Sequence, residues 1–371
     1  MTAPSEASPG SSAAKGGVSA GDRLTALDGW RAISVGLVIF SHLATASSLA
    51  IRPVGPAGRL LEPFLREAGS LGVHIFFVIS GYVIVRGLIA EQAKRGRISM
   101  AGFYIRRCFR ILPPLAIYVA AILALTCLGI LPPKALGVWK ALTFTCNFSD
   151  CGVWWGGHTW SLAYEEQFYL VTPALFLATA ARGRARAFFV FLVALCVIPM
   201  ALAPVDSAPS QFAAPFVAIG IGVAWACAEA FVQRVATRLP TSVALLAIVL
   251  LVLAERLETT RLAPIAAIIA PMLIVYVLSR TALIDLRVAE WLSGRTISFA
   301  GRASYSIYLW QQLATGAYPG AGPLFYIASI FACVAWAAAS FTFIETPLIS
   351  LGRSLSARVG RTARAPRPVS A

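Results

Sequence analysis

Two polar residues, Arg31 and His42, lie in the first apolar stretch of the chain, LDGWRAISVGLVIFSHL. Their spacing of eleven residues equals about three helical turns, so a helix would place both on one face, about 16 Å apart along its axis. Imidazole titrates near neutral pH, and a neutral His42 can therefore accept a proton from a hydroxyl group as a general base. The competing interpretation is a packing histidine hydrogen-bonded across helices. We predict that His42 is catalytic and that Arg31 binds substrate.

A second apolar stretch, TWSLAYEEQFYLVTP, contains two adjacent carboxylates, Glu165 and Glu166. Neighbouring helical residues point about 100° apart, so at most one of the two readily faces a given partner. We predict that one of them orients His42 or binds an acceptor hydroxyl, as part of the catalytic group, while the other meets an arginine. The alternative is a pair of interfacial carboxylates neutralised by Lys or Arg. Three neighbouring residues are candidate substrate-binding residues: His158 in WWGGHTW, Trp160 and Tyr169.

The stretch SLGVHIFFVISGYVIV combines His74 with a small polar spot at Ser80 and Gly81. Glycine lets another helix or a ligand approach the backbone closely, since it carries no side chain. His74 and Ser80 are therefore candidate substrate-binding residues. For His74, an interfacial residue without a role in binding is the alternative.

An arginine motif, FYIRRCFRILPP, places Arg106, Arg107 and Arg110 just before two prolines, Pro113 and Pro114. The prolines predict that the helical segment stops before a new span begins. Guanidinium groups bind phosphate in a bidentate manner, so the arginines are candidate ligands for the phosphates of a nucleotide-bearing donor. Ordinary positive-inside anchoring of a membrane helix would also explain them.

The composition indicates how these residues are positioned. Apolar residues make up 58% of the chain and charged residues only 13%, compared with about 45–50% and 25% in soluble domains. The net charge of +15 does not indicate nucleic-acid binding, because the basic residues lie between apolar segments and not on one amphipathic face. We predict an all-α polytopic membrane protein with ten transmembrane helices, beginning near Ala32, Leu71, Leu112, Trp160, Ala187, Phe212, Ser242, Leu262, Ser298 and Pro323.

The loops between these segments predict the orientation. Every even-numbered loop is basic and the odd-numbered loops are nearly neutral, which places the even loops in the cytoplasm. Both termini are then cytoplasmic, in a bacterial cytoplasmic membrane. We divide the chain into a disordered tail (1–22), a transmembrane domain (23–350) and a basic cytoplasmic tail (351–371).

The seven cysteines are mostly isolated in apolar segments, without the CxxC or Cys/His spacing of a metal site, so we expect no metal. Cys146 and Cys151 differ, because both lie in a polar stretch that the topology places outside the cytoplasm. A disulfide between them is a hypothesis that requires an oxidising compartment.

Six motifs occur in a fixed order between about Leu27 and Pro347: LDGWRAISVGLVIFSHL, GVHIFFVISGYVI, FYIRRCFRILPP, TWSLAYEEQFYL, SYSIYLWQQ and IETP. Together they resemble the acyltransferase-3 family of bacterial membrane O-acyltransferases. The resemblance implies a ten-helix bundle, acyl-CoA as a co-substrate reached from the cytoplasm, and an essential arginine and histidine on the first helix, which correspond to Arg31 and His42. It also implies roles for Glu165, with Glu166 beside it, and for the arginine motif.

Two positions depart from the family pattern. Members often carry an acidic residue where this chain has His74, and a histidine where it has Gln311. Glutamine cannot transfer a proton at neutral pH, so we assign catalysis to His42. The expected reaction moves a short acyl group, such as acetyl, to a sugar hydroxyl of a glycan, glycolipid or macrolide-type product. A transporter or flippase is the alternative, although no internal repeat of broken helices is visible. The oligomeric state is left open.

Overall fold

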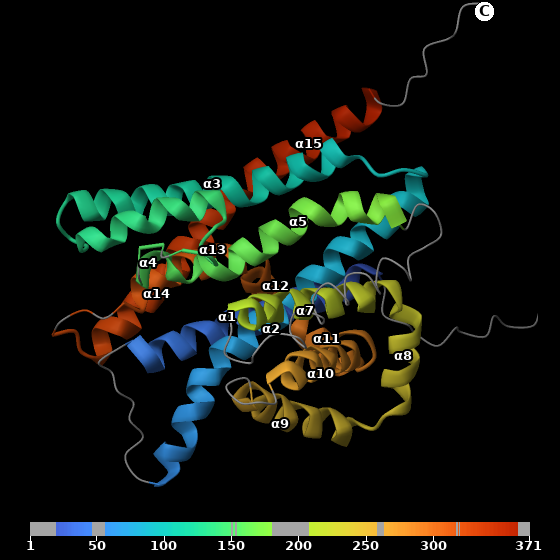
Figure 1. The fold of residues 1–371 in the computed structure, drawn as a ribbon, viewed down its shortest axis with the longest axis horizontal. Coiled ribbons are helices and arrows are strands. Elements are labelled where there is room, and N and C mark those ends of the chain that lie inside the picture. The colour runs from blue at the N-terminus through green and yellow to red at the C-terminus, as the bar shows by residue number, and fades with distance from the viewer. Residues whose placement is uncertain are drawn as a thin grey trace, which may run out of the picture.

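The computed structural model describes residues 20–46, 56–149, 151–152, 154–179, 208–257, 263–316, 318 and 320–362, and throughout these residues its regular elements are helices (Figure 1). The all-α fold class is therefore confirmed. Two predicted segments, the N-terminal tail up to residue 19 and most of the span expected from Ala187, lie outside the described residues. The predicted even loop that carries Arg182, Arg184 and Arg186 also lies outside them.

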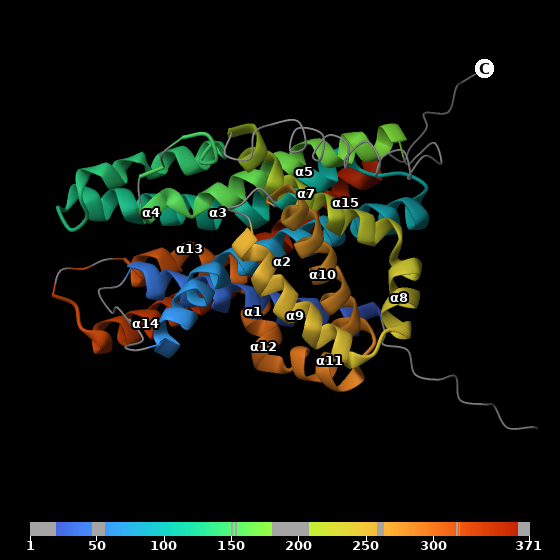
Figure 2. The ribbon, with the colours of Figure 1, turned by 60° about the horizontal axis from the view of Figure 1, so that its bottom comes forward.

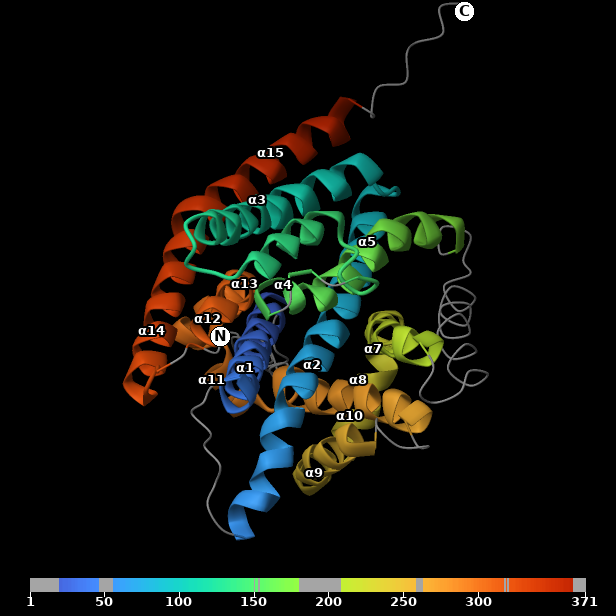
Figure 3. The same ribbon diagram turned by 60° about the vertical axis from the view of Figure 1, so that its left-hand side comes forward.

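Helices α1 (Ala20–Ala46) and α2 (Pro56–Arg95) pack against each other, and α2 also packs against α7 (Ala208–Cys227), as the side view in Figure 3 illustrates. Gly81 and Gly222 allow this second contact. A Cβ atom at Gly81 would collide with the carbonyl oxygen of Ile219, and one at Gly222 would collide with the carbonyl oxygen of Val78. The helix approach predicted at Gly81 is thus confirmed, and α7 is the helix that approaches.

Helix α3 (Met100–Cys127) is continuous, so the predicted stop before Pro113 and Pro114 is wrong. A proline inside a helix leaves carbonyl groups of the preceding turn without their usual partners. Pro113 and Pro114 lack the N–H groups that would bond to the carbonyl groups of Phe109 and Arg110. The Tyr305 hydroxyl donates a hydrogen bond to the next carbonyl oxygen along the helix, that of Ile111, at 3.0 Å and so ties this stretch to another helix. The arginine motif and the following span therefore form one rigid helix.

A compact segment connects α3 to α5 (Thr159–Thr179) through the 3₁₀ helix η1 (Pro133–Thr143) and the short α4 (Trp154–Gly157). Cys146 and Cys151 form a disulfide in it, as hypothesised. The side chain of Gln167 on α5 hydrogen-bonds to Asn147 and to the carbonyl oxygen of Phe144. These contacts fix the segment over the start of α5, where Trp160 is located.

The second half of the chain forms a group of helices around α7, followed by three helices that lead back to α1 (Figure 2). The group around α7 comprises α8 (Glu229–Arg238), α9 (Thr241–Leu257) and α10 (Ala263–Leu283). The short α11 (Leu286–Leu292) and α12 (Arg295–Arg302) then lead to α13 (Ser304–Ala314), which packs against α1.

The described part of the chain ends in a long helical run made of α14 (Pro323–Ser340), the π-helical turn η3 (Phe341–Glu345) and α15 (Thr346–Thr362). α14 packs against α13, and α15 packs against α3. Glu345 in the π-helical turn is buried, with 2% of its surface exposed, and accepts a hydrogen bond from Ser340. α15 lies beside the first half of α3 in Figure 1.

Among the described residues, four helical segments are long and apolar enough to cross a membrane: 67–95, 100–127, 265–282 and 323–359. A fifth is possible if the pair 214–227 and 229–238, bent by 91°, counts as one span. α1 and α5 are not among them, and both carry polar residues of the predicted site. The chain is thus a helical protein with several membrane-spanning segments, and the count of ten stays a prediction.

Candidate active site

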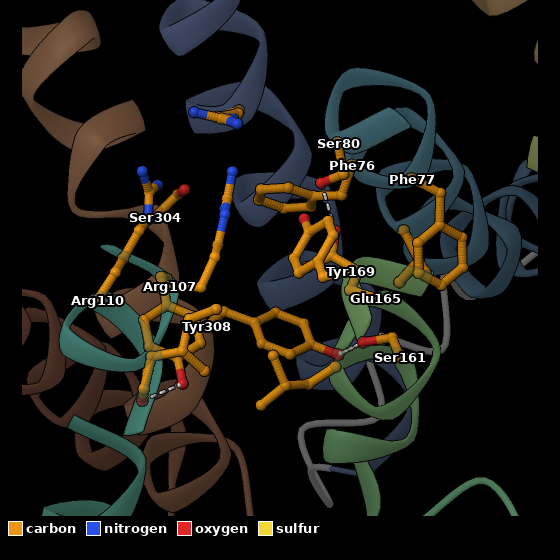
Figure 4. Close-up of a pocket in the computed structure, with 15 residues that line it drawn as sticks. Phe76, Phe77, Ser80, Arg107, Arg110, Ser161, Glu165, Tyr169, Ser304 and Tyr308 are labelled. Carbon is orange, nitrogen blue, oxygen red and sulfur yellow. Dashed lines mark hydrogen bonds between the residues drawn. The ribbon is translucent and has the colours of Figure 1, made fainter. Parts of the chain in front are cut away.

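A narrow cavity of about 80 Å³, here called the arginine cavity, lies between α1, α2, α3, α5 and α13. Three of the predicted arginines line it: Arg31, Arg107 and Arg110. Ser80, Glu165 and Tyr169 line it as well, so the structure brings together six of the predicted site residues. Figure 4 shows this cavity, with Arg107 and Arg110 extending alongside one another.

The polar groups of the arginine cavity are held in fixed positions. The Ser80 hydroxyl donates a hydrogen bond of 2.5 Å to Glu165, drawn as a dashed line in Figure 4. The guanidinium group of Arg107 lies 4.7 Å from the ring centroid of Tyr169, a cation–π contact. Arg31 forms an ion pair of 3.3 Å with Asp28, one turn earlier on α1. Because three arginines and one glutamate are among its described lining residues, the cavity carries more positive than negative charge.

A wider cavity of about 230 Å³, here called the histidine cavity, contains all three histidines of the chain: His42, His74 and His158. Ser41, Ser70 and Trp160 add two hydroxyl groups and an aromatic ring that is 37% exposed. His74, for which an interfacial position was the alternative, is 9% exposed and faces this cavity. Among the residues that the structure describes, no carboxylate or guanidinium group lines this cavity.

His42 is held by Gln311 and not by Glu165. Its Nδ1 atom lies 3.0 Å from Oε1 of Gln311, while Glu165 hydrogen-bonds to Ser80 in the other cavity. A tautomer with the proton on Nδ1 donates to the Gln311 oxygen, which leaves Nε2 as the basic nitrogen. The Trp154 ring packs edge-on against the imidazole at a centroid distance of 5.3 Å. The nearby polar group that orients His42 is therefore an amide and not a carboxylate.

His158, expected near the outer mouth, is buried, with only 4% of its surface exposed. Neither of its ring nitrogens has a hydrogen-bond partner among the residues that the structure describes. The Tyr308 hydroxyl donates to the carbonyl oxygen of His158 at 2.7 Å and lies equally close to Ser161. A buried imidazole with two unused nitrogens is a costly arrangement unless a ligand or water binds there.

The two cavities share part of their wall. Val73 and Tyr308 line both of them. α1 passes from the arginine cavity at Arg31 to the histidine cavity at His42, whereas α2 passes in the opposite direction from His74 to Ser80. The cavities are therefore stacked along the helix axes, and the eleven-residue spacing on α1 corresponds to the step between them.

Two predicted residues lie outside both cavities. Arg106 faces a third cavity and pairs with Glu91 at 3.1 Å. Glu166 does not line the arginine cavity, and its Oε1 atom is buried without a hydrogen-bond partner among the described residues. Of the two adjacent carboxylates, Glu165 is therefore the one that faces the site.

Sequence reasoning missed the structural roles of Gln311, Tyr308 and Trp154. Gln311 stood out only as a departure from the family pattern, although its spacing of three residues from Tyr308 places both on one helix face. Trp154 is distant in the sequence from His42, and only the packing of α4 against α13 brings it to the imidazole.

Three imidazoles thus lie beside a cationic cavity, and imidazole is a group that takes up and releases protons near neutral pH. The comparisons with known proteins show the family of the chain. The chain matches the acyltransferase domain family, acyltransferase-3, over residues 24–344 and belongs to that family. The chain therefore contains an acyltransferase-3 domain over these residues.

Among individual proteins, the chain is 28% identical over 167 residues to the peptidoglycan O-acetyltransferase OatA of Listeria monocytogenes. It is 30% identical over 166 residues to the O-acetyltransferase OatA of Staphylococcus aureus strain NCTC 8325. These alignments cover 41% and 40% of the chain but only 24% of each relative, so the matched region is about a quarter of the relatives' length. No solved structure matches the chain.

Proposed function

We propose that the protein transfers a short acyl group, such as acetyl, from acyl-CoA to a sugar hydroxyl, with His42 as the general base. The observation that carries this proposal is the hydrogen bond of 3.0 Å between Nδ1 of His42 and Gln311, at the wall of a cavity of about 230 Å³. The sugar belongs to a glycan, a glycolipid or a macrolide-type product. Relatedness to enzymes named as peptidoglycan O-acetyltransferases makes a cell-wall glycan one of the acceptors to test.

The donor enters from the arginine cavity and the acceptor occupies the histidine cavity. Nε2 of His42 takes the proton of the acceptor hydroxyl, and the oxygen forms a bond to the thioester carbonyl carbon. The bond between this carbon and sulfur then breaks, and the thiolate leaves with the proton that His42 received. Guanidinium groups of the arginine cavity stabilise the negative charge that develops on the carbonyl oxygen. The products are the acyl ester and free CoA.

The same proposal includes the membrane topology: ten spans, both termini in the cytoplasm and the arginine cavity toward the cytoplasmic side. It is supported by the alternation of helix direction, in which α1 and α13 pass the two cavities in the sense opposite to α2 and α5. A green fluorescent protein fused after Ala371 should fluoresce in bacterial cells, and an alkaline phosphatase at the same position should be inactive. An active phosphatase would refute the cytoplasmic C-terminus.

The function is tested with the purified full-length protein, ¹⁴C-labelled acetyl-CoA and a panel of sugar acceptors that includes peptidoglycan fragments. We expect labelled ester and an equal amount of free CoA. A transporter or flippase, the alternative from the sequence, would move label or lipid across a vesicle membrane without forming ester. Exchange of label between acetyl-CoA and free CoA in the absence of acceptor would indicate an acyl-enzyme intermediate in place of direct transfer.

A further inference from the structure

A third cavity, here called the basic groove, lies beside the arginine cavity and has a volume of about 220 Å³. Arg107 and Arg110 line both spaces, so the basic groove and the arginine cavity share a wall. Glu91 of α2 and Arg106 of α3 complete its inner side. Among the described residues, the other polar side chain of the groove is that of Arg353, which comes from α15 at the other end of the sequence.

α15 is fixed against α3 by close contacts between small residues. A Cβ atom at Gly102 would lie 2.8 Å from the hydroxyl oxygen of Ser356, and one at Gly352 would lie 2.7 Å from the Cβ atom of Phe109. Gly352 and Ser356 are four residues apart, which is the spacing of small residues at closely packed membrane helices. Ser356 also accepts a hydrogen bond of 2.6 Å from Arg106. The groove-facing side of α15 is therefore held in a fixed position.

The groove has an excess of unpaired positive charge. Glu91 is the acidic residue that lines it, and this carboxylate pairs with Arg106 at 3.1 Å and with Arg95 at 3.5 Å. The three other arginines of the groove form no ion pair with an acidic side chain within the described part of the chain: Arg107, Arg110 and Arg353. Three like charges around one cavity repel each other unless an anion binds between them. Arginine is also the residue best suited to bidentate phosphate binding.

We propose that Arg353 completes, together with Arg107 and Arg110, a binding site for the phosphate groups of a nucleotide-bearing acyl donor. The inference rests on the proposed function. Phosphates bound in the basic groove would lie across the shared wall from the arginine cavity, in which the acyl end of the same donor is proposed to bind. Arg353 lies beyond residues 24–344, which the family match covers, so this part of the donor site comes from the C-terminal helix of this chain. An anionic lipid headgroup carries the same phosphate chemistry and is the source to be distinguished.

The test measures binding of adenosine 3′,5′-bisphosphate, which carries nucleotide phosphates without the acyl arm, to the full-length protein in nanodiscs of neutral phosphatidylcholine. Isothermal titration calorimetry should show that Arg353→Ala weakens binding about tenfold, the effect of losing one charge-assisted contact. Arg358→Ala is the matched control, since Arg358 is exposed on the same helix and does not line the groove. This control should bind the bisphosphate like the wild type.

Kinetics separate the nucleotide from the rest of the donor. Arg353→Ala should raise the KM for acetyl-CoA about tenfold without changing kcat. The KM for S-acetylpantetheine, which lacks the nucleotide, should be the same in the variant and the wild type. Equal effects on both donors would overturn the assignment to the phosphates.

Three other results would overturn the inference. The first is a wild-type protein that does not bind the bisphosphate, and the second is an Arg353→Ala variant that binds it as tightly as the wild type. The third is loss of bisphosphate binding in phosphatidylglycerol nanodiscs, which would show that a lipid headgroup occupies the groove. The calorimetric result is independent of acyl transfer. A wild-type protein that binds the bisphosphate but releases no CoA would refute the proposed function and leave the anion site intact.

Discussion

The histidine cavity and the arginine cavity are lined by many of the same helices, yet their chemistry differs. The histidine cavity holds three imidazoles, two serine hydroxyls and a tryptophan, and its volume is about 230 Å³. The arginine cavity holds three guanidinium groups and one glutamate in about 80 Å³. In the proposed function this difference corresponds to a division of tasks, in which the histidine cavity takes the sugar and the proton while the arginine cavity takes the acyl donor.

The largest effect should come from the histidine cavity. Replacing His42 by alanine removes the general base, and we expect kcat to fall about 1,000-fold while the KM for acetyl-CoA stays unchanged. Ester formation with saturating acceptor measures kcat, and size-exclusion chromatography in detergent verifies that the variant is folded. Turnover at the wild-type rate would show that His42 is not the general base and would contradict the proposed roles of the two cavities.

The arginine cavity should affect the donor. Arg107→Ala removes a guanidinium that packs on Tyr169, and we expect the KM for acetyl-CoA to rise about thirtyfold with little change in the KM for acceptor. Arg107→Lys keeps the charge but not the planar stacking, so it should recover only part of the loss. A selective rise in the acceptor KM would reverse the proposed assignment of the cavities.

A smaller effect should follow at Gln311, which orients His42 and does not contact substrate in this proposal. Gln311→Ala should lower kcat about tenfold and leave both KM values unchanged, since one neutral hydrogen bond is lost. Gln311→Glu keeps an acceptor oxygen beside Nδ1 and should restore most of the rate. If the alanine variant instead alters the KM for acceptor, Gln311 binds the sugar directly.

The smallest effect should be at Trp160, whose ring is partly exposed at the histidine cavity. Trp160→Ala should raise the KM for a sugar acceptor about fivefold, because an aromatic face that packs on the sugar ring is lost. Trp160→Phe should retain most of the affinity. An unchanged acceptor KM with a raised donor KM would contradict the assignment of the sugar to this cavity.

Much of the site was predictable because helical periodicity acts over short distances. The eleven residues between Arg31 and His42 correspond to the step between the two cavities, and the 100° separation of Glu165 from Glu166 agrees with only one of them facing the site. The fold class followed from composition and from the apolar segments in the same way.

The partners of these residues were not predictable, because they depend on long-range packing. Gln311 reaches His42 across 269 residues of sequence, and Ser80 reaches Glu165 across 85. The break predicted at Pro113 was wrong for the same reason, because α3 runs on through both prolines while it packs against α15 and α13, which lie far away in the sequence.

The π-helical turn at Phe341–Glu345 has a consequence for how the C-terminal helix can vary among relatives. A π turn accommodates one residue more than an α-helical turn, so it corresponds to a single-residue insertion in a helix. Removing that residue would rotate all later residues by about 100° around the helix axis. Arg353 would then point away from the basic groove, and Gly352 and Ser356 would lose their contacts with α3. The number of residues in this turn, and not their identity, therefore determines which side of α15 faces the rest of the protein.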